Sequence, residues 1–127
     1  MHTPGDETET AIDTYCAAWN HPDPTQRRAI LVKVWGDGAS YTDPSVHAAG
    51  IDALLAHIGA VIARRPGVKV LRASHIDRHH DMALFAWRAS HPDGTVLLDG
   101  VDFVELSDDG KIRRIVGFFG SMAHPAR

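Results

Sequence analysis

Apolar residues follow two different spacings along this chain. In the first half they recur every three to four residues, the period of an α-helix with one buried face, over residues 7–20, 24–35 and 51–64. In the second half they mostly alternate with other residues over 69–77, 82–90, 96–106 and 112–119, as in strands with one buried face. A short strand is expected at 39–43. Helices followed by a run of strands predict an α+β fold.

The ends of the helices carry recognisable signals. Asp23-Pro24 suits a helix start, Gly36-Asp37-Gly38 is expected to break the second helix, and Pro66-Gly67 to stop the third. His57 borders the apolar stripe of the third helix. The inward residues expected on the first helix are Ile12, Tyr15, Cys16 and Trp19, and those on the third are Ile51, Leu54, Leu55, Ile58 and Ile62.

Short polar turns at residues 78–81, 91–94 and 107–110 predict antiparallel neighbours among the later strands. Such strands can form a curved sheet whose concave face is covered by the helices. We expect a pocket between the two layers. In the short strand, Tyr41 and Asp43 share a face with Ala39, and Pro44 favours an extended backbone at Asp43.

Asp102 is the most informative residue, because alternation places it on the same strand face as Leu98, Gly100, Val104 and Leu106. A carboxyl group on an apolar face must find a partner or stay protonated. Two interpretations stay open: a structural Asp bonded to a neighbour, or an acid that serves a small enclosed site.

Composition limits the class of protein. The 127 residues predict one domain over residues 1–127, with residues 1–6 as a flexible tail. A net charge of −3 and scattered cations argue against a nucleic-acid partner. The single Cys16 excludes an internal disulfide, and the polar start and the lack of a long apolar run lead us to expect a cytoplasmic protein without a membrane partner.

Several motifs together resemble the nuclear transport factor 2-like superfamily, and within it the SnoaL-like proteins. The resemblance implies three N-terminal helices and a cone-shaped, curved antiparallel or mixed sheet around a deep cavity, with a homodimer formed through the outer sheet face. The matching segments are Tyr15 with Trp19-Asn20, Tyr41-Thr42-Asp43-Pro44, Gly50-Ile51-Asp52-Ala53-Leu54, Gly100-Val101-Asp102-Phe103-Val104-Glu105-Leu106, Asp109-Gly110-Lys111-Ile112 and Gly117-Phe118-Phe119-Gly120.

Within the superfamily the chain is similar to ketosteroid isomerase. That resemblance implies Asp43 as the base, with Tyr15 and a protonated Asp102 as the donors that stabilise an enolate oxygen. Ketosteroid isomerase is itself the standard example of a neutral carboxylic acid donor. The third helix carries no tyrosine, so one supporting hydrogen bond of some isomerases has no counterpart.

Each candidate also has a structural interpretation. Asp43 can be a turn acceptor, Tyr15 a core aromatic, and His57 either a core histidine, a second base or a group that orients Asp43. The aromatic residues are expected in the core, some of them lining the pocket. The expected ligand-binding residues are His57, Trp19, Trp35, Tyr41, Trp87 and Phe118.

Neither a metal nor a cofactor is expected. His75, His79 and His80 with Asp77 and Asp81 lack the spacing of a metal-binding helix and suit a solvated turn. Three classes of function therefore stay open. The first is a cofactor-free isomerase, cyclase or hydratase acting on a small, largely apolar or aromatic carbonyl compound. The second binds such a ligand without chemistry, and the third is a protein-interaction dimer.

Overall fold

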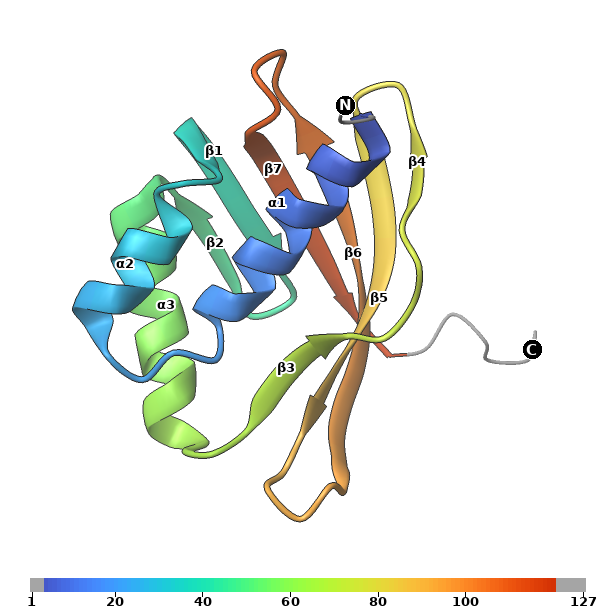
Figure 1. The fold of residues 1–127 in the computed structure, drawn as a ribbon. Coiled ribbons are helices and arrows are strands. Elements are labelled where there is room, and N and C mark those ends of the chain that lie inside the picture. Colours follow the sequence, from blue (N-terminus) through green and yellow to red (C-terminus); the bar gives the residue numbers. More distant parts are fainter. Residues whose placement is uncertain (1–3, 121–127) are drawn as a thin grey trace.

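The computed structural model describes residues 4–120, with side chains described from Glu7 onward. Three helices lie against one face of a curved, mixed sheet, which stays open at both edges (Figure 1). The helices are α1 (Pro4–Ala18), α2 (Pro24–Leu31) and α3 (Ile51–Arg64); the strands are β1 (Trp35–Asp43), β2 (Val46–Ala49), β3 (Lys69–Arg72), β4 (Asp77–His79), β5 (Met82–Ser90), β6 (Val96–Leu106) and β7 (Ile112–Phe119).

The strand order is β2-β1-β7-β6-β5-β3, and β4 also pairs with β5. All neighbours are antiparallel except β1 and β7, which run parallel. The α+β class and the mixed, curved sheet expected from the sequence are confirmed. Residues 4–6, expected in a flexible tail, form the first turn of α1, and residues 1–3 lie outside the described part. No helix in residues 4–120 is long and apolar enough to cross a membrane.

The second helix is shorter than its periodicity predicted. It begins as expected, with Asp23 accepting a hydrogen bond from the backbone of Thr25 at 2.9 Å, but ends at Leu31 instead of continuing to Trp35. The backbone carbonyl of Val34 accepts from Ile112, and Trp35 pairs with Ile112 in the sheet. Residues 32–34 therefore form a turn, and pairing with β7 places Trp35 in β1 instead of in the helix.

Gly36-Asp37-Gly38 belongs to β1 and does not separate the strand from the helix, which corrects the predicted start at residue 39. The register between β1 and β7 shifts between Trp35 and Ser40, so this segment is a bulge. Gly36 allows it, since a Cβ there would stand 2.8 Å from the carbonyl oxygen of Ile112. Beyond the bulge, Ala39 and Tyr41 share a face as predicted, and both are buried in the core.

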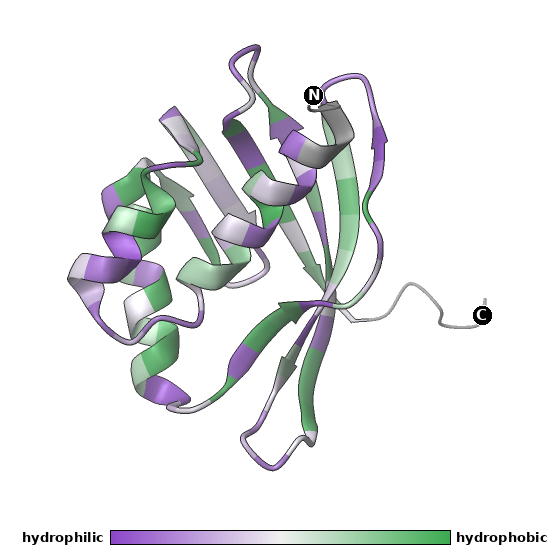
Figure 2. Ribbon diagram, viewed as in Figure 1, coloured by the Kyte–Doolittle hydropathy of each residue, from purple (hydrophilic) through white to green (hydrophobic). Residues whose placement is uncertain are grey.

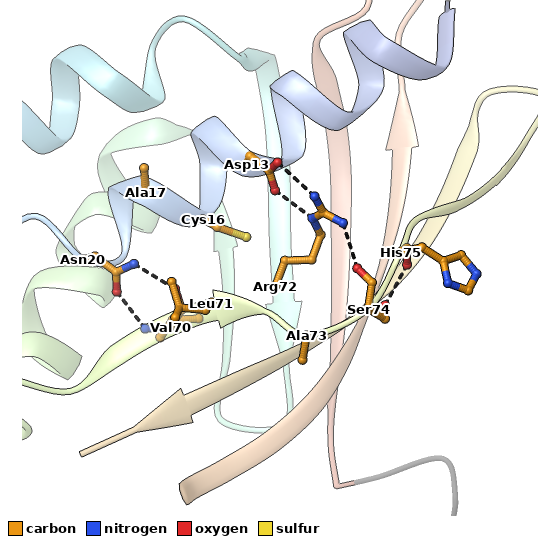
Figure 3. A pocket seen from close by; sticks show the side chains of 10 residues that line it. All are labelled: Asp13, Cys16, Ala17, Asn20, Val70, Leu71, Arg72, Ala73, Ser74 and His75. Carbon is orange, nitrogen blue, oxygen red and sulfur yellow. Dashed lines mark hydrogen bonds and ion pairs between the residues drawn. The ribbon is translucent and has the colours of Figure 1, made fainter. Parts of the chain in front are cut away.

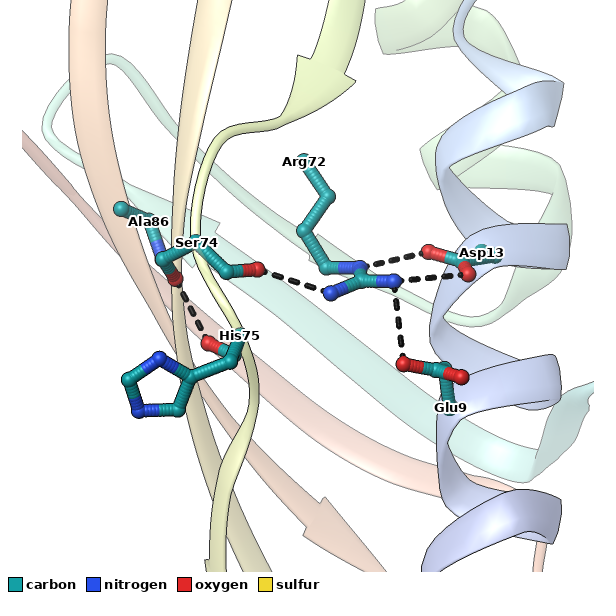
Figure 4. A network of polar contacts seen from close by, with 6 residues as sticks. All are labelled: Glu9, Asp13, Arg72, Ser74, His75 and Ala86. Atoms are coloured by element: carbon teal, nitrogen blue, oxygen red, sulfur yellow. Dashed lines mark hydrogen bonds and ion pairs between the residues drawn. The ribbon is translucent and has the colours of Figure 1, made fainter.

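The strand predicted over residues 69–77 ends at Arg72 as β3, and β4 begins at Asp77 and extends into the predicted turn 78–81. The hydroxyl of Ser74 accepts a hydrogen bond from the backbone of Ala86 at 2.8 Å, so a side chain replaces the backbone acceptor that a continuous ladder would supply. Arg72 fixes the break by donating to the carbonyl of Ser74 at 2.7 Å (Figure 4). The short β4 that follows is hydrophilic and exposed (Figure 2).

Helix α3 and strands β5, β6 and β7 have the predicted bounds. The sequence did not predict β2, which pairs with β1 across the two-residue turn Pro44-Ser45. The core lies between the helices and the sheet, and the predicted inward stripe of α1 is buried there. Phe118 and Phe119, expected in the core, are 58% and 44% exposed at the end of β7.

Candidate functional site

The space between helices and sheet contains a cavity of about 390 Å³. Its inner end is formed by buried residues of α1, β1, β5 and β6, whereas the exposed lining residues, Ser45, Arg64, Arg65 and Phe119, mark its opening. The lining residues are Tyr15, Cys16, Trp19, Tyr41, Asp43, Ser45, His57, Val61, Arg64, Arg65, Val68, Val70, Phe85, Trp87, Ala89, Leu97, Leu98, Asp102 and Phe119.

Asp102 faces this cavity and is only 5% exposed. The indole Nε1 of Trp87 donates to Oδ1 of Asp102 at 3.0 Å. Trp87 stands opposite Gly100 in the sheet, and its ring lies over that glycine, where a Cβ would stand 2.0 Å from the ring. The absence of a side chain at residue 100 therefore lets the indole reach the carboxyl group two residues further along β6.

A second glycine, on β7, leaves the space that the carboxyl group of Asp102 occupies. Gly117 is the partner of Asp102 on β7, and a Cβ there would stand 2.9 Å from Oδ1 of Asp102 and 3.7 Å from the hydroxyl of Tyr41. Burial raises the pKa of Asp102 to about 7, the Trp87 hydrogen bond opposes this, and the charge of Asp43 adds to it. Near neutral pH both the acid and the carboxylate of Asp102 are populated.

Asp43 is held by several donors at the end of β1. The hydroxyl of Tyr41 donates to its Oδ2 at 2.6 Å, and the backbone and hydroxyl of Ser45 both donate to its Oδ1 at 2.7 Å. The Nε2 of His57 stands 3.7 Å from Oδ2. The turn-acceptor interpretation of Asp43 is thus correct for one oxygen. The other oxygen faces Tyr41 and His57.

His57 lies between Asp43 and the aromatic wall. Its ring meets Trp19 edge-on and tilts against Tyr41, each at 5.8 Å between ring centroids. Burial lowers the pKa of His57, the carboxylate of Asp43 opposes this, and the positive charge of Arg64 lowers it further. The imidazole is therefore neutral at pH 7 and can accept a proton.

Tyr15 is 2% exposed on α1, where it stacks on Trp35 at 6.1 Å between centroids. The pKa of Tyr15 lies well above its ordinary value, mainly because the phenol is buried and secondly because of the charge of Asp102. Burial, followed by the bond to Asp43, raises the pKa of Tyr41 in the same direction. Both phenols stay protonated at pH 7. The hydroxyl of Tyr41 already donates to Asp43, so Tyr15 is the phenol considered as a donor to a ligand.

The structure brings most of the predicted site residues together. Tyr15, Asp43 and Asp102 all line the cavity, as do the predicted ligand-binding residues His57, Trp19, Tyr41 and Trp87. Trp35 does not line it, because it lies buried beneath Tyr15. Phe118 faces the outside of the sheet and Phe119 lines the cavity instead, as alternation from the inward Ile115 and Gly117 requires.

Sequence reasoning missed Ser45, Arg64 and Arg65 as lining residues. Ser45 carried a usable signal, since a serine two residues after Asp at a Pro turn is a common partner of the Asp side chain. The two arginines stand at the end of the third helix, Arg64 as its last residue and Arg65 directly after it, and nothing in their spacing placed them beside the cavity.

A second hollow, about 660 Å³, is an open groove between α1 and the segment 70–75 (Figure 3). It meets the inner cavity at Cys16 and Val70, which line both. Its polar groups bind one another: Asn20 exchanges two hydrogen bonds with the backbone of Val70, and Arg72 binds Asp13 and Glu9 (Figures 3 and 4). This paired arrangement joins α1 to β3. The inner cavity, with its perturbed acids and phenols, is the candidate site.

The histidine-rich turn forms local contacts in the structure. His75 binds Asp77 at 3.1 Å, and His79 contacts His80 at 3.0 Å. Within residues 4–120, no three His, Cys, Asp or Glu side chains are grouped so that they could hold a metal ion.

Three helices on a curved, open sheet, with an internal cavity between them, define a nuclear transport factor 2-like fold. The family model described as "SnoaL-like domain" matches residues 12–115. The chain therefore belongs to the SnoaL-like family. No curated protein matches it.

Solved structures agree with this assignment. A proposed isomerase of the SnoaL-like family from Agrobacterium tumefaciens is 33% identical, with a TM-score of 0.85 over 91% of this chain and 98% of that one. A proposed SnoaL-like polyketide cyclase from Jannaschia sp. is 16% identical, with a TM-score of 0.72 over 89% and 84% of the two chains. A nuclear transport factor 2-like protein of unknown function from Exiguobacterium sp. is 21% identical, with a TM-score of 0.69 over 88% and 99%. The latter two show the fold alone.

Proposed function

We propose that the protein is a cofactor-free enzyme that binds a small, largely apolar carbonyl compound in the inner cavity and moves a proton next to the carbonyl group, as an isomerase, cyclase or hydratase does. The observation that carries the proposal is Asp102, a buried acid that faces the cavity and has a pKa of about 7. Its neutral form can donate a hydrogen bond to a ligand oxygen.

Tyr15 supplies the second donor. It lines the same cavity, and the charge of Asp102 adds to the rise in its pKa, which places the two groups in the same electrostatic environment. Removing a proton beside a carbonyl group moves negative charge onto the oxygen, so neutral donors already in place stabilise that charge as it develops. The apolar and aromatic wall formed by Trp19, Phe85 and Trp87 suits a planar or ring-shaped body.

The proton is accepted at the pair formed by Asp43 and His57. Asp43 alone is a poor choice, because Tyr41 and Ser45 already occupy three of the roughly four acceptor positions of its carboxylate. The neutral imidazole of His57 stands with Nε2 facing Asp43. In this arrangement Nε2 carries its hydrogen toward Asp43 and Nδ1 of His57 takes the proton, while the carboxylate of Asp43 holds the ring and balances the charge of the imidazolium.

The oxyanion part is tested with α-tetralone, an apolar ketone whose oxygen can only accept hydrogen bonds. Its affinity, followed by quenching of Trp fluorescence, is expected to fall for the wild type between about pH 6 and pH 8, as Asp102 ionises. Asp102→Asn, whose amide keeps a donor at every pH, is expected to bind with no such fall. Tyr15→Phe is expected to weaken binding at every pH. Unchanged affinity in Tyr15→Phe, together with parallel pH profiles for wild type and Asp102→Asn, would falsify the oxyanion site.

The base is tested on a panel of enones, epoxides and cyclic ketones. For any compound that is turned over, His57→Gln is expected to lower kcat by about 100-fold or more. Asp43→Asn is expected to lower kcat less and to shift the acid limb of the pH profile, because it acts through the imidazole. If Asp43→Asn lowered kcat more than His57→Gln, Asp43 itself would be the base.

A binding protein without chemistry is the alternative, and the three hydrogen bonds that Asp43 already accepts favour it. It predicts that α-tetralone binds with the same dependence on Tyr15 and Asp102, while no compound of the panel is turned over. Binding and turnover measured on the same preparation separate the two functions.

We also propose that the outer sheet face joins two copies of the chain. Apolar residues adjoin across β5, β6 and β7 on this face, where Leu84 pairs with Phe103 and Val101 with Phe118. Leu84 and Phe118 are exposed, which leaves an apolar surface for a second copy to cover. Light scattering after size exclusion should give twice the chain mass, and Phe118→Glu should give a monomer. A monomeric wild type at micromolar concentration would exclude the dimer.

A further inference from the structure

The mouth of the inner cavity carries two arginines. Arg64 ends α3 and Arg65 follows it, and both line the cavity although both are exposed. The wholly buried lining residues, such as Tyr15 and Asp102, lie at the other end. A ligand that fills the cavity therefore extends from the acids and phenols inside to the guanidinium groups at the opening.

Both guanidinium groups are free of ion pairs within the described residues. Arg28, Arg72, Arg88, Arg113 and Arg114 each bind a carboxylate. For Arg64 and Arg65, no described carboxylate lies within 4.0 Å, and the only acids that line the cavity with them are Asp43 and Asp102 at the inner end. The positive charge at the mouth is thus not neutralised by a neighbouring side chain.

The charge of Arg64 reaches into the cavity. It contributes to the lowered pKa of His57, after burial and against Asp43. An anionic group bound at the mouth would offset that influence. The position of Arg64 in the last turn of α3 also places it near the negative end of the helix dipole, which favours any cation. Arg65 is the C-cap residue of α3, so the dipole favours a cation there as well.

Charge varies along the cavity in a way that orients a ligand. A carboxylate is disfavoured at the inner end, where Asp43 and a partly ionised Asp102 stand in apolar surroundings, and favoured at the mouth. A carbonyl oxygen, in contrast, meets the donors Tyr15 and Asp102. An apolar body with a carbonyl at one end and an anion at the other matches both ends.

Given the proposed function, on which the ligand class rests, we infer that the enzyme is specific for carbonyl compounds that carry a carboxylate, with Arg64 and Arg65 binding that carboxylate at the cavity mouth. Two arginines can each give a carboxylate paired hydrogen bonds, which adds geometric selectivity to the charge.

The inference is tested without the natural ligand. N-phenyl-1-naphthylamine, a neutral fluorophore, reports on the cavity, and ω-phenylalkanoates from phenylpropanoate to phenyloctanoate compete with it against their matching alcohols. The series varies the distance between ring and carboxylate, so one member spans the cavity. The variants are the double variant Arg64→Gln/Arg65→Gln and the control Arg78→Gln, which removes an exposed arginine of β4 that lines neither hollow.

For the wild type, the best-fitting acid is expected to bind about tenfold more tightly than its alcohol, and this preference should decline with added salt. The double variant is expected to bind acid and alcohol alike, with alcohol affinities unchanged within about twofold. Arg78→Gln should behave as the wild type.

Three results would overturn the inference: equal binding of acids and alcohols by the wild type, a preference that survives in the double variant, or the same loss in Arg78→Gln. If the alcohols displace the fluorophore and the acids have no advantage, only the anion site is refuted. If no compound displaces it, the cavity does not bind such ligands and the proposed function fails as well.

Discussion

Replacing Asp102 by Asn is expected to change how the stability of the fold depends on pH. The side chain is almost wholly buried, and burial raises its pKa from 3.8 to about 7. Asn has nearly the same shape and cannot ionise. A comparison of the two proteins across pH therefore isolates the free energy of ionising Asp102 inside the fold.

The magnitude follows from the pKa change at 1.36 kcal/mol per pKa unit. A rise of the pKa from 3.8 to about 7 corresponds to a change of about 4 kcal/mol in the free energy of unfolding. The folded protein binds this proton more tightly than the unfolded chain, so stability is greatest below the unfolded pKa and falls as pH rises. The loss accumulates until pH passes the folded pKa of about 7 and is then constant. Between about pH 5 and pH 8 it amounts to roughly 2.5 kcal/mol.

Urea unfolding of both proteins at several pH values measures the difference. The free energy of unfolding of the wild type should fall relative to Asp102→Asn by that amount between about pH 5 and pH 8. Asp99→Asn is the matched control, because Asp99 lies on the same strand but binds Arg88 on the outer face. The free energy of unfolding of Asp99→Asn should change with pH in parallel with that of the wild type. A parallel curve for Asp102→Asn as well would refute a buried carboxyl group with a raised pKa.

Three further predictions concern the surroundings of this acid. Gly100→Ala would bring a Cβ to 2.0 Å from the Trp87 ring, so urea unfolding should show that the free energy of unfolding falls by about 2–3 kcal/mol. The control Gly94→Ala has open space but a φ of +89°, and should lose about 1 kcal/mol. Equal losses in the two variants would contradict the close packing at Gly100. Trp87→Phe removes the hydrogen bond that lowers the pKa of Asp102, so the pH at which its free energy of unfolding stops falling should move above about 7, and an unmoved end of the fall would show that the bond does not act on the acid. Arg72→Ala breaks the link between α1 and β3 and should lower the free energy of unfolding by about 1 kcal/mol, less in high salt, since the ion pairs are partly exposed; no change at low salt would make the link energetically neutral (Figure 4).

The parts of the fold that sequence predicted best are those with both periodicity and end signals. Helix α3 has its apolar stripe, then Pro66-Gly67, and its bounds agree with the prediction. The last three long strands are bounded by polar turns and agree equally well. The family resemblance supplied what periodicity could not, a mixed sheet in place of a purely antiparallel one.

The errors occurred where contacts distant in sequence decide local structure. Val34 and Trp35 continue a helical pattern, yet β7 pairs with them and ends α2 earlier. Ser74 breaks a strand because its hydroxyl binds Ala86, twelve residues away. Neither event can be read from nearby residues, since each depends on which strand becomes the neighbour.

For the site, alternation placed Asp102 on the apolar strand face and the family resemblance assigned Asp43, but neither says what holds them. The donor to Asp102 is Trp87, predicted only as a ligand-binding aromatic. For the base, prediction and structure differ more. Asp43, the predicted base, already accepts hydrogen bonds from Tyr41 and Ser45, so His57 is the proton acceptor that we propose. A family motif transfers residue types, while hydrogen-bond partners depend on the surrounding side chains.

Two glycines explain why an acid can stand on this apolar face at all. Gly100 and Gly117 are neighbours of Trp87 and Asp102 across the sheet, and a side chain at either would occupy the space of the indole or of the carboxyl group. In sequence both read as weak points in a strand. An inward Asp two residues after an inward Gly, with Trp opposite that Gly, is a more specific signal than the Asp alone, because it includes the room and the partner that a buried carboxyl group requires.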